Sequence, residues 1–237
     1  MIFIVSSPKR GGIDPDALVI PEGYGMPKIS YMFDNDAALE EIPIRIIGKP
    51  TSASYAFQGF NSLKRLPDID YSECKAYQYF VDSCYDLEEI DLSSADPSKL
   101  VNAAWIYGFG TTAVQRIVNM PLNENVTIAT AYNQCFSGCQ SLTDISFNGK
   151  FGSSVNFSAC PFSSASPLLN IAYALSENNV GTVTFKSGTA VSTIMSNAHC
   201  RLNSAGDGLE TCNAGDEGDL GTISQYITGK GWTVTFV

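Results

Sequence analysis

The most regular feature of the chain is a line of mostly apolar positions that recurs with the same internal spacing. Each copy has four positions three residues apart, and the third is a leucine or valine. The five copies read Phe33-x2-Asp36-x2-Leu39-x2-Ile42, Phe57-x2-Phe60-x2-Leu63-x2-Leu66, Val81-x2-Cys84-x2-Leu87-x2-Ile90, Gly108-x2-Thr111-x2-Val114-x2-Ile117 and Phe136-x2-Cys139-x2-Leu142-x2-Ile145. Their third positions are 24, 24, 27 and 28 residues apart. This period indicates one structural unit that is repeated along the chain.

The second half of a copy, which we call its tail, alternates apolar and polar residues as a β-strand does. The tails Leu39–Ile44, Leu63–Asp68, Leu87–Leu92 and Leu142–Phe147 each predict one short strand. Stacked copies would form a parallel sheet, and the first half of each copy would make the turn on the opposite, convex side. No copy can bury its apolar face alone, so neighbours are required. The predicted fold class is an α+β repeat, a short solenoid of about five rungs with a parallel β-sheet and an α/β C-terminal cap.

Two stretches carry a family resemblance, Ala56-Phe57-Gln58-Gly59-Phe60-Asn61-Ser62-Leu63 and Cys135-Phe136-Ser137-Gly138-Cys139-Gln140-Ser141-Leu142. They resemble the BspA-type leucine-rich repeats, whose hallmark is the line A-F-x-x-C-x-S-L-x-x-I. The period also falls within the roughly 20–29 residues of leucine-rich repeats. The resemblance extends from near Phe33 to near Cys160, and it is closest in the fifth copy. The fourth copy, aligned on Gly108, lacks both the aromatic residue and the cysteine.

The pattern divides the chain into three regions: an N-terminal leader or attachment segment (1–30), the leucine-rich repeats (31–160) and a C-terminal capping region (161–237). The leader is rich in glycine and proline and predicts at most one hairpin. In the capping region we expect a helix from about Ser164, a strand at 181–185, helices at 189–198 and 223–227, a strand at 229–236 and a loop at 205–221. This ending resembles the tail of such repeat proteins from gut bacteria and their bacteriophages.

Composition excludes several classes of function. The 237 residues carry a formal charge of −10, and no run is basic, which argues against nucleic acid and anionic membranes as partners. The apolar run at the N-terminus is five residues long and precedes Lys9-Arg10, the reverse of a signal peptide. No apolar run approaches the ~20 residues of a membrane span. We therefore expect no export signal and no membrane insertion.

The residues that could support catalysis or bind metal are few. The seven cysteines lack zinc-site spacing, so we interpret them as buried free thiols, with a Cys200–Cys212 disulfide as the alternative. His199 is the only histidine, and we interpret it as an ordinary surface or cap residue. The acidic stretch 206–219 lacks EF-hand spacing and is interpreted as a solvated loop instead of a calcium site. We therefore expect no enzyme activity, no cofactor and no metal.

The predicted strand face carries outward columns in which the sign of charge alternates. One column is Glu41, Arg65, Glu89, Arg116 and Asp144, and its neighbour is Glu40, Lys64, Glu88, Gln115 and Thr143. Opposite charges about 4.8 Å apart would neutralise one another and fix the register of the strands. The alternative is that this face binds a ligand.

A second candidate surface is aromatic and lies before the anchors of the copies. Its members are Tyr55, Tyr77, Tyr79, Trp105, Tyr107 and Tyr132. They suit either packing on the convex side or recognition of a partner. The candidate ligand-binding residues are Glu41, Arg65, Glu89, Arg116, Asp144, Trp105 and Tyr107.

These patterns and the resemblance lead us to expect a non-enzymatic structural or adhesive module. The favoured interpretation is a bacteriophage virion protein, such as a tail or head fibre, a decoration protein or a host-attachment protein. Its N-terminal segment would contact other virion proteins, and its repeats would face a protein or glycan of the host surface. The alternative is a bacterial adhesin at the cell surface or in the extracellular space. The sequence leaves open whether the chain forms a homo-oligomer.

Overall fold

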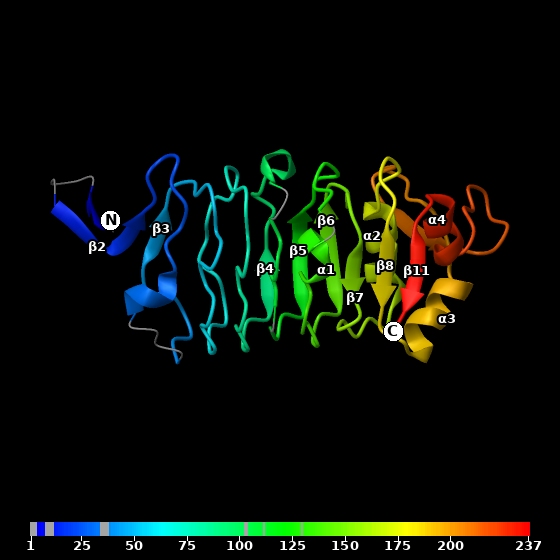
Figure 1. The fold of residues 1–237 in the computed structure, drawn as a ribbon, viewed down its shortest axis with the longest axis horizontal. Coiled ribbons are helices and arrows are strands. Elements are labelled where there is room, and N and C mark those ends of the chain that lie inside the picture. The colour runs from blue at the N-terminus through cyan, green and yellow to red at the C-terminus, as the bar shows by residue number, and fades with distance from the viewer. Residues whose placement is uncertain (1–3, 8–11, 34–37, 102–103, 111, 129) are drawn as a thin grey trace.

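The computed structural model describes residues 4–7, 12–33, 38–101, 104–110, 112–128 and 130–237, and it has an α+β fold with several parallel strand pairs and few helices. The strands are β1 (Ile4–Ser7), β2 (Gly12–Val19), β3 (Arg45–Ile47), β4 (Glu89–Asp91), β5 (Arg116–Pro121), β6 (Asp144–Asn148), β7 (Val155–Phe157), β8 (Thr182–Phe185), β9 (His199–Leu202), β10 (Leu209–Cys212) and β11 (Thr233–Phe236). The α-helices are α1 (Thr130–Asn133), α2 (Ala165–Ala174), α3 (Thr189–Asn197) and α4 (Ile223–Gly229), and short 3-10 helices cover Ile29–Phe33 and Pro97–Lys99. Up to β8 these elements follow one another along the long axis of the molecule, and β11 returns to lie beside β8 (Figure 1).

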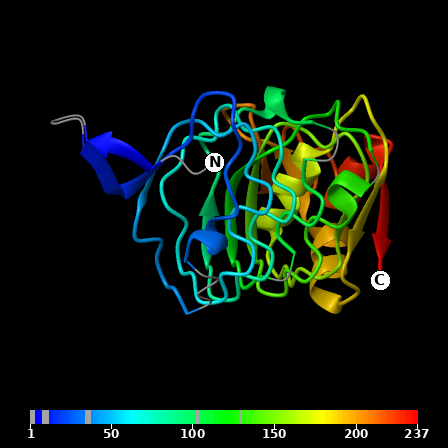
Figure 2. The same cartoon turned by 60° about the vertical axis from the view of Figure 1, so that its left-hand side comes forward.

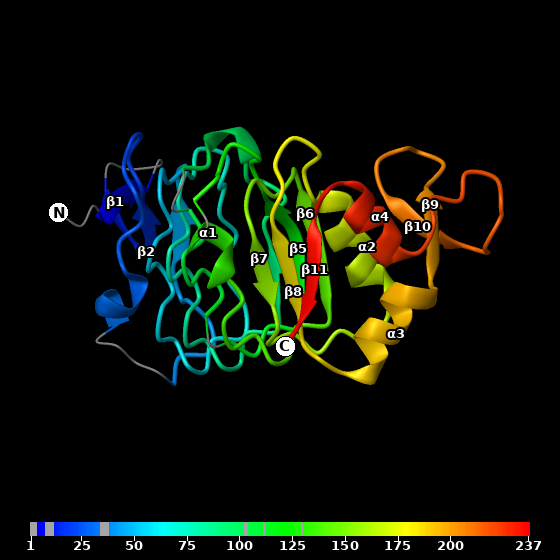
Figure 3. The same cartoon turned by 45° about the vertical axis from the view of Figure 1, so that its right-hand side comes forward.

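Parallel pairing of the strand tails is confirmed in the later copies. Strands β4, β5 and β6 form one parallel sheet in that order. Within it Ile90 pairs with Ile117 and Ile117 with Ile145, so that the isoleucines of three successive copies stack inside the protein. A second parallel sheet has the order β11-β8-β7 and brings the C-terminal region beside the last copy (Figure 3).

The strands predicted for the first two tails are wrong. Residues 39–44 and 63–68 lie in no strand, and β3 starts only at Arg45, where it pairs with β2. Both tails hold a proline at the same position, Pro43 and Pro67, four residues after the leucine. Proline has no N–H to donate and is excluded from the interior of a sheet. The equivalent residues of the later copies are Asp91, Val118 and Ser146, which all lie in strands.

The first halves of the copies are joined by backbone hydrogen bonds. The N–H of Phe57 donates to the carbonyl of Phe80 at 3.0 Å, and that of Gly59 donates to Asp82 at 2.9 Å. The next copy continues the series, because the N–H of Val81 donates to Gly108 at 3.1 Å. Consecutive turns of the chain therefore lie side by side on this half of the molecule too (Figure 2).

The alignment of the fourth copy needs a correction of one residue. The N–H of Phe109 donates to the carbonyl of Cys135, and the parallel pattern sets Phe109, not Gly108, beside Phe136. The two rings stack with centroids 5.7 Å apart. Thr112 takes the place of the cysteine, since it follows Phe109 by three residues as Cys139 follows Phe136, and its hydroxyl lies 4.0 Å from the Cys139 thiol. The copy keeps its aromatic residue and is one residue shorter before Val114, so fixed three-residue steps miss it.

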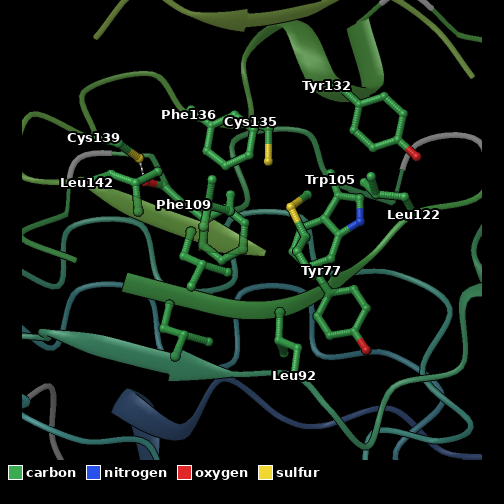
Figure 4. Packing of buried hydrophobic residues seen from close by; sticks show 14 of the residues in the cluster. Tyr77, Leu92, Trp105, Phe109, Leu122, Tyr132, Cys135, Phe136, Cys139 and Leu142 are labelled. Atoms are coloured by element: carbon green, nitrogen blue, oxygen red, sulfur yellow. Dashed lines mark hydrogen bonds between the residues drawn. The ribbon is translucent and has the colours of Figure 1, made fainter. Parts of the chain in front are cut away.

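Aromatic side chains connect the interior from Tyr77 to Phe136 (Figure 4), and the row continues through Phe157 to Phe185 of the C-terminal region, with the centroids of these last two rings 6.1 Å apart. Tyr77 stacks on Trp105 at 4.4 Å between centroids, Trp105 on Phe109 at 5.0 Å, and Phe136 on Phe157 at 4.6 Å. All of these side chains are fully buried. The repeats and the capping region therefore share one hydrophobic core, with no boundary in the packing at residue 160.

The thiols follow the favoured interpretation. All seven cysteines are free, and all but Cys212 are buried. Cys200 pairs with Thr211 in the β9–β10 hairpin, and Cys212 pairs with His199. Because side chains alternate between the faces of a strand, Cys200 and Cys212 point to opposite faces, which does not suit a disulfide.

The two ends of the chain are more regular than the sequence indicates. At the N-terminal end, the predicted hairpin is present as the antiparallel pair β1–β2. Residues 17–29 also hydrogen-bond to residues 45–56, which joins much of the leader to the first copy. At the other end, α2, β8, α3, α4 and β11 occur where they are expected. The loop predicted at 205–221 is wrong in part, because it contains strand β10, which pairs with β9.

Candidate functional site

Three members of the predicted charge column form a ladder on the strand face. Glu89, Arg116 and Asp144 lie in register on β4, β5 and β6. Arg116 contacts Glu89 through Nη1 at 3.3 Å and Asp144 through Nε at 3.2 Å. The three side chains are about half exposed, so each ion pair adds only about 0.2–1 kcal/mol. In the neighbouring column, Lys64 pairs with Glu40 at 2.6 Å, and this bond raises the pKa of Lys64.

The other two members of the column are not part of this ladder. Within the described residues, neither Glu41 nor Arg65 forms an ion pair. Arg65 belongs to the tail that Pro67 keeps out of the sheet. An open groove of about 780 Å³ lies at this break and runs between residues 64–71 and residues 88–94. The structure therefore brings Arg65 and Glu89 to one groove without pairing them.

The groove is acidic. Lys64 and Arg65 are its two cations, and its five carboxylates belong to Asp68, Asp70, Glu88, Glu89 and Asp91. Some of these groups are already satisfied by neighbours. Lys64 is held by Glu40, while hydrogen bonds from Ser72 lower the pKa of Asp70. A negative lining with half-buried Leu66 and Ile69 fits a partner that presents basic and apolar groups.

One wall of the groove is the free edge of a sheet. Strand β4 is the terminal strand of the sheet β4-β5-β6. On the other wall, no backbone N–H of residues 65–70 donates a hydrogen bond to any of the described residues. Unpaired backbone groups at an exposed edge are ready to bond to a partner. The groove thus offers main-chain as well as side-chain contacts.

The aromatic candidates divide into core and surface residues. Tyr77, Trp105 and Tyr132 are fully buried, and the indole nitrogen of Trp105 donates to the carbonyl of Pro121 at 3.1 Å. Trp105, one of the candidate ligand-binding residues, is therefore not accessible to a ligand. Tyr107 is only two residues from Trp105 in the sequence, but it lies at the surface.

Tyr107 is the last member of a surface row of stacked tyrosines. Tyr55 and Tyr79 stack with centroids 5.0 Å apart, and Tyr79 and Tyr107 stack at 5.1 Å. All three have positive φ angles, of 63°, 50° and 51°. This conformation costs roughly 1–2 kcal/mol in a residue other than glycine. The stacking of the rings offsets roughly 0.5–1.5 kcal/mol for each pair. The repeat spacing indicates the row, but its left-handed backbone has no signal in the sequence.

His199 holds a turn together. Its Nδ1 lies 2.9 Å from the Asp219 carboxylate, which also accepts the N–H groups of Gly215 and Gly221 at 2.8 Å each. These hydrogen bonds lower the pKa of Asp219 to about 2, and the bond from the Gly215 N–H has the largest effect. The Cys212 thiol lies 3.8 Å from the same carboxylate, and burial raises its pKa, so it stays protonated. The cluster is suited to closing the segment after β10.

The described residues contain no cluster of three or more histidine, cysteine, aspartate or glutamate side chains arranged to hold a metal ion. Nor does any helix in the described part of the chain have the length and apolar character needed to cross a bilayer. Searches against protein-family models, curated proteins and solved structures found no match for this chain. Its function must therefore be argued from its own surfaces.

Proposed function

We propose that the chain is a short leucine-rich-repeat solenoid of the BspA type, with about five rungs, and that it works as a non-enzymatic attachment module of a bacteriophage virion. The observation that carries this proposal is the combination of cross-copy backbone bonds with one continuous aromatic core. Such a stack is stiff and holds outward side chains at fixed spacing, which suits binding without chemistry. The repeated sequence line and its period support the same interpretation.

In this proposal the two ends of the molecule have different tasks. The N-terminal segment, about residues 1–30, contacts other virion proteins. The strand face points away from the particle, and the acidic groove beside Arg65 contacts the host surface. The groove supports this role because its carboxylates Asp68, Glu88 and Asp91 form no ion pair with the described residues, whereas Glu89 is paired with Arg116 in the ladder.

Two experiments test the proposal. Mass spectrometry of purified particles should detect the chain as a stoichiometric component. Separately, an excess of the purified chain should compete with the particles for adsorption to host cells. Absence from particles together with no effect on adsorption would refute the virion role, and recovery of the chain from a bacterial envelope or culture medium would support the adhesin alternative.

A charge-reversed variant shows whether the groove is the contact. The double variant Asp68→Lys and Glu88→Lys reverses two carboxylates that line the groove. The double variant Glu22→Lys and Glu217→Lys changes the net charge equally at exposed sites outside it. We expect the first variant to lose competition and the second to retain it. Equal behaviour of the two would place the contact elsewhere on the chain.

A further inference from the structure

A second cavity lies where the repeats meet the C-terminal region, with lining residues different from those of the acidic groove. It has a volume of about 500 Å³ and is bounded by β5, β6, α2 and the turn between β9 and β10. Figures 1 and 3 show α2 beside β6, with the β9–β10 hairpin beyond it. Its polar lining is unusual because four side chains are primary amides: Asn119, Asn148, Asn170 and Asn203. We call this cavity the amide pocket.

Asn119 is held at the pocket by a distortion of β5. The pairing of β5 with β6 slips between Ile117 and Met120, and Asn119 in this bulge has a φ of 53°. Its N–H donates to Ser146 Oγ at 2.9 Å, and its Nδ2 donates to Ser93 Oγ at 2.7 Å. Bulges redirect side chains, and backbone strain of this kind gathers at binding sites. The carboxamide oxygen of Asn119 accepts no hydrogen bond from the described residues.

The amides on the other walls are also fixed. Asn170, on α2, donates through Nδ2 to the carbonyl of Ile145 at 2.9 Å, which leaves its oxygen available. Asn203 exchanges two hydrogen bonds with Asp207 across the β9–β10 turn. Asn148 is exposed at the rim, and its amide has no partner among the described residues. The pocket therefore combines the fixed acceptor oxygens of Asn119 and Asn170 with the amide of Asn148, which can both donate and accept.

One cation and one carboxylate line the pocket. Lys150 is half buried and donates to the backbone carbonyl of Tyr173, and its ammonium lies 3.6 Å from the centroid of the Tyr173 ring. Asp207 carries the opposite charge on the facing turn. The Tyr173 hydroxyl donates to the carbonyl of Gly206 at 3.2 Å, which ties α2 to that turn. The lining therefore has a net formal charge of zero, and we expect a neutral ligand.

From this arrangement we propose that the amide pocket binds a neutral saccharide. Each sugar hydroxyl both donates and accepts hydrogen bonds, and a carboxamide offers both functions side by side. Half-buried Phe147 and Leu209 add apolar surface for the C–H face of a sugar ring. Pockets of this size with a few fixed polar groups are typical of small-ligand sites. The inference stands on this geometry and does not require the virion role.

The test is titration calorimetry, with saturation-transfer NMR for weak binders, on the full chain. The probes are glucose, galactose, mannose, N-acetylglucosamine and their short homo-oligomers, with sialyllactose as an anionic comparison. We expect saturable binding of at least one neutral probe. Asn148→Ala should weaken that binding about tenfold, the effect of losing a pair of hydrogen bonds.

Asn119→Gly should weaken binding to a similar extent, because glycine keeps the positive φ while the amide is lost. Asn61→Ala, an exposed asparagine outside the pocket, is the matched control and should leave binding unchanged. The melting temperature of each variant checks that it is folded. No binding of any neutral probe, binding of sialyllactose alone, or equal affinity in all variants would overturn the proposal. If the purified chain competes with the particles for adsorption but binds no saccharide, the saccharide proposal is overturned and the proposed function stands.

Discussion

The first two copies and the last three use the same apolar pattern with different results on the strand face. In the later copies the tails become β4, β5 and β6 and pair in register. In the earlier copies residues 39–44 and 63–68 remain outside any strand, and the acidic groove opens beside the second of them. The leucine position does not separate the second copy from the later ones, since Leu63, Leu87 and Leu142 are all fully buried, but Leu39 of the first copy is half-buried. We attribute the contrast to Pro43 and Pro67, each of which removes a backbone donor from its tail.

This comparison separates two functions of the repeat. The apolar anchors hold the copies together, and the residue four places after the leucine decides whether neighbouring backbones also bond on the strand face. The unpaired stretch 63–68 leaves a groove and an arginine without an ion partner among the described residues, whereas the paired strands hold Arg116 between Glu89 and Asp144. The distinction can be tested with variants that add a proline to a paired strand or remove the proline from an unpaired tail.

The largest effect is expected from the shared core. Phe57 and Phe136 occupy equivalent, fully buried positions in the two regions. Replacement of either by alanine should lower the free energy of unfolding by about 3–5 kcal/mol, because both leave a cavity in the same core. Urea denaturation of the two variants measures this. A loss below about 1 kcal/mol for Phe57→Ala alone would mean that the first region is not packed as tightly as the second.

A proline placed in the ordered region should reproduce the open one. Val118 is the residue of β5 that corresponds to Pro67. Val118→Pro should cost about 3 kcal/mol, because a central strand loses a donor and gains a ring that does not fit the ladder. The measurement is again denaturant unfolding.

The reverse change is the matched control for this prediction. Pro67→Val should restore a donor and raise the exchange protection of residues 65–69. A gain of less than about 1 kcal/mol is expected, since an added hydrogen bond contributes little net stability. Slower exchange without the proline would support the account, whereas an unchanged exchange pattern would show that another feature opens the groove.

A smaller effect is expected from the charge columns. Arg116→Glu should destabilise the chain by about 1 kcal/mol, since two exposed ion pairs become repulsive. Arg65→Glu should change stability by less than about 0.5 kcal/mol, because Arg65 has no ion partner among the described residues. The difference should shrink in high salt. Equal losses for the two variants would contradict the assignment of the ladder to the later copies.

The smallest effect is local and lies outside both regions. The pKa of Asp219 falls from an ordinary 3.8 to about 2 in the folded chain. Its stabilising contribution is therefore complete above pH 3.8 and is lost as the pH falls through about 2. The protection of the Gly215 and Gly221 amides, measured by NMR relative to the exchange of an unfolded amide at the same pH, should fall over this range. Asp219→Asn should show reduced protection already at neutral pH, and protection that stays constant through this window would argue against the carboxylate as the acceptor.

Much of the fold could be predicted because burial follows the repeated line. The strands of the later copies, the buried thiols and the helices of the C-terminal region all come from apolar spacing. The first two strands could have been excluded by weighing Pro43 and Pro67. The shift to Phe109 was missed because the fourth copy is one residue shorter, and the β9–β10 hairpin was missed because its flanks are rich in glycine and acid.

The candidate site was less predictable for a different physical reason. Register could be inferred for Glu89, Arg116 and Asp144, but it does not tell which charges remain unpaired. Trp105 and Tyr107 are two residues apart, and one is buried while the other is at the surface. The amide pocket brings together Asn119 and Asn203 from distant segments, and no local pattern links them.

Amide hydrogen exchange of the unmodified chain, followed residue by residue by NMR, tests the central claim most directly. Slow exchange is expected at Phe57, Val81, Arg116 and Asp144, whose N–H groups donate to the neighbouring copy. Fast exchange is expected at Arg65, Leu66, Asp68 and Ile69, whose N–H groups donate to none of the described residues. Protection of the second group equal to that of the first would contradict the account, because the strand face would then be continuous and the groove closed.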